Sequence, residues 1–400
     1  MSRVAVANNC MEGRRVAHRF VPFQGMDGLE QIAPAWLRLL ESMPQARFNH
    51  FPGWYRAHLA SGRTDPATVW FLAAYDDNER LTGIFPLQAQ SRSVRFVHPR
   101  LLGSVDDDEL QLSDFIFAPS AKTAGLVHEL AGWLRSQSII RWDHLRILKI
   151  PDDSSLAYSA RARLPTLTIV ETYDGSAYFD TSLSYEQATQ AMTNKFRSNL
   201  RRRARLAEQS AQLRFQSYGR PEELDEAFRI FLEVEASGWK GLAGTSSAIS
   251  CRPGALAFYS ALVREFAPRG ECVINILWHG EQAIASQFGL RFGRALHLLK
   301  VGYRDDMAQL APGILLHDMT IRAACQNPDI DLLSLVNNPD WAKCFKPLTH
   351  PVRIYRTPNW TVRGLVLHLG LLARRGWTRW KSGRGKDIPS VKDPPAPEDA

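Results

Sequence analysis

The stretch ALHLLKVGYRDDMAQLAPGILL, residues 295–316, carries the clearest structural signal in the chain. Its apolar first part predicts a strand, and a period of two places Leu296, Leu298 and Lys300 on one face of that strand. Pro312 suits the first position of a helix, so a loop and a helix are expected to follow. The first N–H groups of a helix have no intrahelical partner and attract anions such as a pyrophosphate. The alternative is that Pro312 and Gly313 simply begin a packed helix.

The same order of elements appears twice in the sequence. Around residues 295–316 we expect strands at 273–278, 283–291, 295–301 and 330–336, with a helix from residue 312. About 200 residues earlier the chain predicts strands at 69–76, 81–90, 94–98 and 145–150, with a helix over 121–136. A helical segment over 185–209 would join the two copies. The pattern predicts an α/β (α+β) protein of two lobes, each a mixed, mostly antiparallel sheet flanked by helices.

The length of 400 residues also favours more than one core. We expect lobes at 14–180 and 181–357, a basic amphipathic helix at 358–382 and a disordered tail at 383–400. Apolar residues recur at helical spacing between Trp360 and Leu372, with arginines around them. The tail is polar and rich in proline, and such a segment cannot bury a core.

The net charge of +8 comes from two local surfaces. Residues 353–386 contain nine Lys or Arg and no acid, and a second basic cluster spans 195–205. Apolar residues within 195–205 give it a buried stripe, so its arginines are expected to form a solvated helix face, and nucleic acid is not an expected partner. Five scattered cysteines without a Cys-x-x-Cys pair, and histidines without metal-ligand spacing, predict neither disulfides nor a bound metal.

The first twenty residues lack the continuous apolar core of a signal peptide. The longest apolar run in the C-terminal region is about half of a membrane span, which needs roughly 20 residues. A cytoplasmic location is expected, with the helix at 359–380 as a candidate for peripheral contact with the inner face of the membrane.

Five short motifs, in order, resemble one family: EASGWKG (235–241), FY (258–259), GEQAIA (280–285), LKVGY (299–303) and PGILL (312–316). Over residues 185–356 the chain resembles the GNAT-related acetyltransferase domain of CelD/BcsL-type cellulose-biosynthesis proteins. It is also similar to the FemABX peptidyltransferases, which are built from two tandem GNAT lobes. The resemblance implies two GNAT-like lobes and transfer of an acyl group from acetyl-CoA or another acyl-CoA. The implied acceptor is a sugar, an amino sugar or another cell-envelope or exopolysaccharide precursor.

The resemblance and side-chain chemistry together suggest site residues. Glu235 is the candidate base, Tyr303 the candidate acid for the leaving thiolate, and Lys300 a third catalytic candidate. Strand N–H groups near Gln287 are candidates for holding the oxyanion. The other cofactor-binding candidates are Gln309, Pro312, Gly313 and Ile314, and the substrate-binding candidates are Trp239, Lys240 and Asp305.

Each candidate also has a purely structural interpretation: Glu235 as a solvated helix residue, Trp239 as a core anchor, Lys240 as a surface cation and Tyr303 as a cover on the sheet edge. The sequence departs from the usual GNAT pyrophosphate loop, Gln/Arg-x-x-Gly-x-Gly/Ala, because its first glycine comes one position late. Aminoacyl-tRNA, the donor of FemABX relatives, therefore stays an alternative to acyl-CoA, and a non-catalytic scaffold in polysaccharide biosynthesis is a third interpretation. A donor site of the GNAT kind needs two strands that separate, expected here at 283–291 and 295–301.

Overall fold

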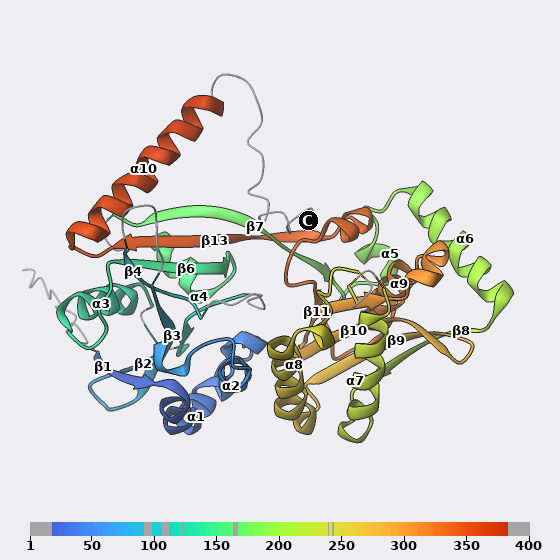
Figure 1. The fold of residues 1–400 in the computed structure, drawn as a ribbon, viewed down its shortest axis with the longest axis horizontal. Helices are drawn as coiled ribbons and strands as arrows, with labels where there is room; N and C mark the ends of the chain where they lie inside the picture. The colour runs from blue at the N-terminus through green and yellow to red at the C-terminus, as the bar shows by residue number, and fades with distance from the viewer. Residues whose placement is uncertain are drawn as a thin grey trace, which may run out of the picture.

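A computed structural model describes residues 18–91, 98–105, 112–119, 121, 123–162, 167–238, 240–241 and 244–382. Among these residues thirteen strands form one sheet, with the order β1-β2-β3-β4-β6-β13-β7-β12-β11-β10-β9-β8 and with β5 paired to β3. Helices pack on both faces of this sheet (Figure 1). The expected tail at 383–400, residues 14–17 of the first expected lobe and most of the expected strand at 94–98 lie outside the described residues.

The first half of the chain forms one lobe. Its strands are β1 (Arg19–Gln24), β2 (Val69–Tyr75), β3 (Leu81–Ser91), β4 (Arg100–Gly103), β5 (Ile116–Phe117) and β6 (His144–Pro151). Its helices are α1 (Gly25–Glu41), α2 (Pro52–Ala60), α3 (Thr123–Ser136) and α4 (Ser155–Ala162). Neighbouring strands are antiparallel except for β4 and β6, which are parallel.

The second half repeats this arrangement. Its strands are β8 (Leu213–Tyr218), β9 (Cys272–His279), β10 (Gln282–Phe292), β11 (Ala295–Tyr303) and β12 (Leu332–Ser334). Its main helices are α7 (Pro221–Ala236), α8 (Pro253–Phe266) and α9 (Pro312–Gln326). Strands β8 to β11 are antiparallel and β11 and β12 are parallel, as β4 and β6 are in the first lobe. The predicted duplication of two mostly antiparallel, helix-flanked lobes is confirmed.

Two long strands join the lobes into one sheet. Strand β13 (Leu348–Pro358) pairs with β6 and β7, and β7 (Ile169–Asp180) pairs with β12. Figure 1 shows both strands running from one lobe to the other. The helical segment expected over 185–209 consists of two helices, because Ser184 and Thr193 each cap a helix start, which gives α5 (Tyr185–Ala188) and α6 (Asn194–Ser210).

Helices of both lobes share a core on one face of the sheet. Buried side chains of α1, α2, α7 and α8 belong to a single cluster, in which the Trp54 and Phe258 rings meet edge to face at 5.2 Å. Helices α3 and α4 cover the opposite face of the first lobe, and α6 and α9 cover that of the second. The lobes therefore meet through packed helices as well as through strands, which holds their facing loops together.

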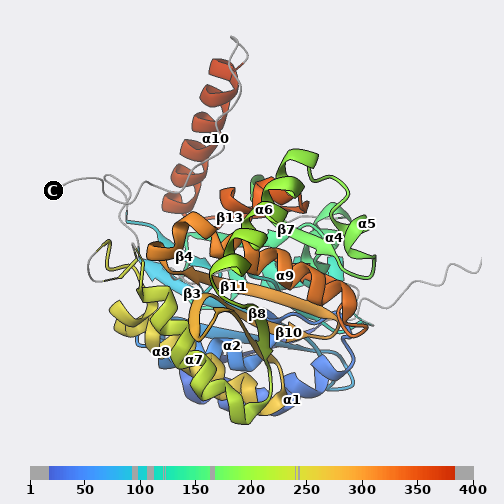
Figure 2. The same ribbon diagram turned by 90° about the vertical axis from the view of Figure 1, so that its right-hand side faces the viewer.

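Helix α10 (Val362–Ser382) leaves the body beside the first lobe and projects outward (Figures 1 and 2). Its base is anchored by Asp143, whose carboxylate accepts hydrogen bonds from Thr361 Oγ1 at 2.9 Å and from the Arg100 guanidinium at 2.8 Å. Among the described residues, no helix combines the length and the apolar character that crossing a membrane requires.

Candidate functional site

Strand β11 contains a β-bulge at the position where the chemistry was expected. Its ladder with β10 skips Leu299, which is an extra residue in β11. Leu298 packs in the core beneath α9, whereas the Nζ atom of Lys300 lies 5.9 Å from the ring centroid of Tyr259 on α8. The expected placement of Lys300 on the same face as Leu298 is wrong, because a bulge turns the residues that follow it to the opposite face.

The end of β11 lies directly against the end of α7. A Cβ atom built on Gly302 would lie 2.6 Å from the Cα atom of Glu235, so only glycine permits this approach. Glu235 is 3% exposed; its Oε2 accepts a hydrogen bond of 2.8 Å from the Ile249 N–H, and its Oε1 lies 3.5 Å from Lys240 Nζ. Lys240 Nζ also donates to the Val301 carbonyl at 3.0 Å. These contacts support the loop that follows α7, and a role for Glu235 as base stays a prediction.

The substrate-binding candidates lie around this same loop. Burial lowers the pKa of Lys240, and the Glu235 carboxylate partly offsets that effect. The Asp305 carboxyl group packs against the loop, since a Cβ atom on Gly238 would lie 3.0 Å from its Cγ atom. Trp239 lies outside the described residues. The structure thus brings Lys240 and Asp305 close to the end of α7, and their binding of substrate remains untested.

Helix α9 begins beneath Tyr303. Ala311 has left-handed torsion angles (φ 50°, ψ 57°) and turns the chain from a short 3₁₀ helix, Asp305–Leu310, into α9 at Pro312. A Cβ atom on Gly313 would lie 3.3 Å from the Tyr303 ring, so the ring covers the first turn of α9. The N-terminus expected at Pro312 is confirmed. Gln309, in the short helix, Gly313 and Ile314 flank this start.

A small cavity of about 240 Å³ adjoins the start of α9. Ala311 and Ile314 line it from the α9 side, and Asn199 and Arg203 line it from α6. Phe196, Leu200 and Cys344 complete its lining, which is mostly apolar, so the cavity itself offers few polar groups to an anion. Part of the basic cluster at 195–205 therefore faces this cavity, although the sequence suggested only a solvated surface.

Gln287 lies away from this cavity. It is 1% exposed, its Oε1 accepts a hydrogen bond of 2.8 Å from Thr320 Oγ1, and its Nε2 is 3.5 Å from His317 Nδ1. Its backbone pairs with strands on both sides. These contacts place the Gln287 side chain within the core under α9, and its role in cofactor binding stays a prediction.

Strands β11 and β12 separate toward the start of α9. They pair over three residues only, and the last pair is His297 with Ser334. The separation expected between 283–291 and 295–301 is wrong, because β10 and β11 pair along their whole length on either side of the bulge. The place where neighbouring strands stop pairing is one strand further along the sheet, where β11 continues to Tyr303 beyond its last pair with β12.

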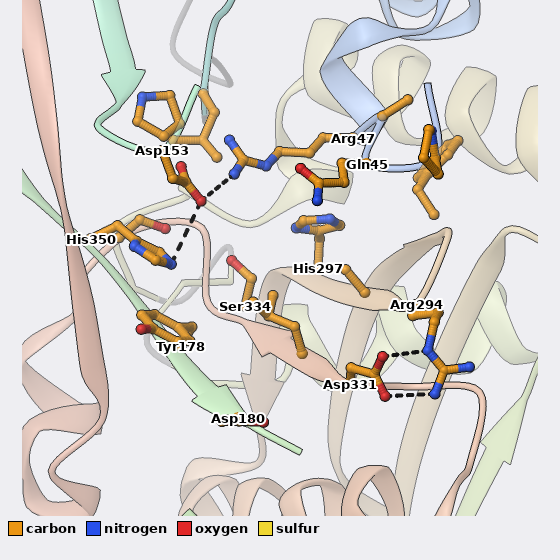
Figure 3. Close-up of a pocket in the computed structure, with 18 residues that line it drawn as sticks. Gln45, Arg47, Asp153, Tyr178, Asp180, Arg294, His297, Asp331, Ser334 and His350 are labelled. Carbon is orange, nitrogen blue, oxygen red and sulfur yellow. Dashed lines mark hydrogen bonds and ion pairs between the residues drawn. The ribbon is translucent and has the colours of Figure 1, made fainter. Parts of the chain in front are cut away.

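A larger cavity of about 630 Å³ lies between the lobes (Figure 3). The loop after α1 contributes Arg47, the turn after β6 contributes Asp153, and β7, β11, β12 and β13 form most of the remaining walls. Arg47 Nη2 donates to Asp153 Oδ2 at 2.6 Å, and His350 Nε2 lies 3.7 Å from the same oxygen atom. Burial alone would raise the pKa of Asp153, but Arg47 and His350 hold it below its ordinary value.

His297 of β11 projects into this cavity (Figure 3). The side chain is 2% exposed, and within the described residues neither ring nitrogen has a hydrogen-bond partner. Phe48 packs edge to face on the ring at 5.2 Å. Burial lowers the pKa of His297 to about 3, and the charge of Arg47 acts in the same direction. The imidazole is therefore neutral near pH 7, with one donor and one acceptor nitrogen.

Sequence patterns did not single out the residues of this cavity. Arg47, Asp153, His297 and His350 come from four distant segments, and each is ordinary in its own context. The one available signal was His297, a polar residue within the apolar strand pattern of 295–301. In the described part of the chain, no group of three or more His, Cys, Asp or Glu is arranged to hold a metal ion.

Comparisons with solved structures indicate the fold. The C-terminal domain of a putative lysylphosphatidylglycerol synthetase from Agrobacterium fabrum is similar over 86% of this chain and 95% of that chain, at 9% identity and a TM-score of 0.51. FemX is similar over 81% of this chain and 95% of that chain, also at 9% identity and a TM-score of 0.51. A protein of unknown function from Bacteroides thetaiotaomicron is similar over 83% of this chain and 97% of that chain, at 12% identity and a TM-score of 0.50.

Such low identities establish a shared fold and nothing about substrate. No match was found among curated proteins. The family described as acetyltransferase (GNAT) domain matches residues 194–340, which include α7, α8, β9 to β12 and α9. Residues 194–340 are therefore similar to the GNAT acetyltransferase domain, in a chain whose overall fold is similar to that of FemX.

Proposed function

We propose that this protein transfers an acyl group from acetyl-CoA or another acyl-CoA to an amine or hydroxyl group. The proposed acceptor is a sugar, an amino sugar or another precursor of the cell envelope or of an exopolysaccharide, as in the CelD/BcsL type. The observation that carries the proposal is the opening between β11 and β12, with the start of α9 at its open end, inside the segment that matches the GNAT domain.

The opening suits an extended thioester donor. Its phosphates would lie at the start of α9, where Gly313 presents a backbone N–H group and Arg203 adds a positive charge. The arm that bears the thioester would follow the edge of β11 toward the bulge. At Leu299 the ladder is interrupted, which makes its backbone N–H a better candidate for the oxyanion than the paired groups at Gln287.

The reaction requires one bond to form and one to break. The acceptor nitrogen or oxygen attacks the thioester carbonyl carbon and loses its proton, and the C–S bond then breaks to release the thiolate. The Tyr303 ring covers the first turn of α9, at the phosphate end of this path, so its expected role as proton donor to the thiolate stays a prediction. Glu235 remains the proposed base for the acceptor, and Lys240 Nζ lies 3.5 Å from its Oε1 atom.

Thermal denaturation with acetyl-CoA tests the donor. A ligand of the native state at 100 times its Kd adds about 2.7 kcal/mol of stability. We expect Arg203→Ala to reduce this stabilisation, because Arg203 lines the cavity at the start of α9. Arg202→Ala is the matched control, because Arg202 is exposed on the same helix. An absence of stabilisation by any acyl-CoA at millimolar concentration would exclude coenzyme A as the carrier.

The two alternative functions predict different results. Transfer of an aminoacyl group from tRNA predicts salt-sensitive RNA binding that is lost when Arg201, Arg202 and Arg203 are neutralised. A non-catalytic scaffold predicts that Tyr303→Phe and Lys300→Ala keep full biological activity, whereas removal of α10 abolishes it.

We further propose that the protein is cytoplasmic and that α10 contacts the inner face of the membrane. The exposed side of α10 carries an apolar row: Val362, Val366, Leu369, Leu372 and Trp377. Residues 359–382 contain five Lys or Arg and no acid, and each such cation near an anionic lipid surface contributes about 1 kcal/mol. Wild type is expected to sediment with phosphatidylglycerol vesicles and not with phosphatidylcholine vesicles. Equal sedimentation of wild type and a chain truncated after Pro358 would reject this contact.

A further inference from the structure

His297 is the feature of the inter-lobe cavity that points most directly to a ligand. A buried polar group without a hydrogen bond costs about 1 to 3 kcal/mol, so proteins rarely retain one without a use. His297 has two such nitrogens, and both belong to a side chain that lines a large cavity (Figure 3). An imidazole at that position can receive one hydrogen bond from a ligand and donate one to it.

The wall opposite His297 suits a ring that carries hydroxyl groups. The rings of Tyr178 and His350 stack with their centroids 4.1 Å apart at an angle of 4°, which makes a flat aromatic surface. Asp153 with Arg47 on one side, and Ser334 on the other, place acceptors and donors around that surface (Figure 3). A few polar groups on an otherwise apolar lining are typical of small-molecule sites, whose volumes run from roughly 300 to 1,000 Å³.

The charge of the lining restricts the class of ligand. Two arginines and three aspartates line the cavity, so its fixed charges sum to one net negative charge. Each arginine is already engaged, Arg47 with Asp153 and Arg294 with Asp331. A polyanion such as the phosphates of a nucleotide would meet net repulsion here, whereas a neutral or singly cationic ligand would not.

The position of the cavity connects it to the proposed chemistry. His297 and Ser334 both line it, and they are the last pair before β11 and β12 separate. The bulge at Leu299 lies two residues further along β11. A ligand that touches His297 would therefore lie beside the inner end of the opening that we assign to the donor.

We infer that the inter-lobe cavity is the acceptor site, that it takes a neutral or cationic hydroxyl-bearing ring such as an amino sugar, and that His297 hydrogen-bonds that ring. The assignment of this cavity to the acceptor rests on the proposed function. Binding of the ring to the cavity does not, because it can be measured without any donor. His297 and the aromatic surface of Tyr178 and His350 would then hold the nucleophilic group of the ring toward the opening.

The test is binding of glucosamine and chitobiose, measured by ligand-observed NMR without coenzyme A. His297→Phe keeps the ring shape and removes both unpartnered nitrogens. We expect it to melt at or above the wild-type temperature and to weaken sugar binding at least tenfold. The matched control is His317→Phe, a buried histidine of the same lobe outside the cavity lining, which is expected to keep wild-type sugar binding.

Three outcomes overturn the inference: no binding of either sugar to wild type, unchanged binding to His297→Phe, or binding of glucose 6-phosphate as tight as that of glucosamine. Failure of the proposed function would give a different result: acyl-CoA would not stabilise the protein, but the sugars would still bind. Retained stabilisation by acetyl-CoA in His297→Phe, together with lost sugar binding, supports separate donor and acceptor sites.

Discussion

Replacing Gly302 with alanine tests the contact that places the end of β11 against α7. The added Cβ atom would lie 2.6 Å from Glu235 Cα and 2.8 Å from Glu235 Cβ, whereas ordinary contacts begin at 3.4 Å. Backbone lies on both sides, so no flexible side chain can move aside, and the two segments must separate by about 1 Å. Overpacking of this kind costs about 1 to 3 kcal/mol, and the reduced entropy of the unfolded chain returns about 0.4 to 1 kcal/mol.

Thermal denaturation and amide hydrogen exchange measure the result. We expect Gly302→Ala to melt below wild type and to exchange faster at the Ile249 N–H, whose bond to Glu235 depends on the position of α7. Gly132→Ala, within α3, is the control, because nothing lies within 4 Å of its added Cβ atom. The control is expected to equal or exceed the stability of wild type. If Gly302→Ala is as stable as wild type and exchanges Ile249 at the same rate, the tight approach of β11 to α7 is refuted.

Three further predictions concern buried ionisable groups. Glu235→Gln is expected to destabilise the fold by about 1.5 to 3 kcal/mol in thermal melts, because a charged acceptor of hydrogen bonds is lost; unchanged stability would contradict the structural role. Burial lowers the pKa values of His297 and His317 to about 3, so the unfolded chain takes up protons first as pH falls below about 6.5. Urea denaturation should show stability falling between pH 6.5 and 3 by about 1.4 kcal/mol per pH unit for each histidine, with a shallower slope in His317→Phe; equal slopes would argue against this assignment. Burial alone would raise the pKa of Asp143, but hydrogen bonds from Arg100 and Thr361 lower it to about 2, so its contribution is present above about pH 4 and is lost toward pH 2. Asp143→Asn should lower the melting temperature at pH 7 and leave it unchanged near pH 2, and an equal loss at both pH values would count against the ion pair.

Local patterns predicted much of the second lobe. Strands β9, β10 and β11 and the start of α9 lie where apolar periodicity and Pro312 placed them, because those signals come from residues adjacent in sequence. The duplication was also predictable, since the order of elements repeats even where side chains differ. The long strands β7 and β13 were not anticipated, and they are the elements that merge the two sheets.

The candidate site also has parts that local sequence predicted and parts that it did not. Tyr303, Gly313 and Ile314 meet at the start of α9 as the spacing suggested, and Glu235 meets Lys240 close to β11. The face occupied by Lys300 was misjudged, because a bulge depends on how two strands pair and leaves no mark in the sequence of one strand.

Sequence by itself determined the class of fold, the repeated order of elements and a strand–loop–helix unit suited to an anion, because hydrophobic period and helix-start chemistry act over a few residues. Only the tertiary structure decided which strands separate, which of the basic residues faces the start of α9, and that a cavity between the lobes contains His297. The cavity is built from segments up to about 300 residues apart in the chain. Its charge and its unpartnered imidazole exist only once packing has brought those segments together and removed water from around them.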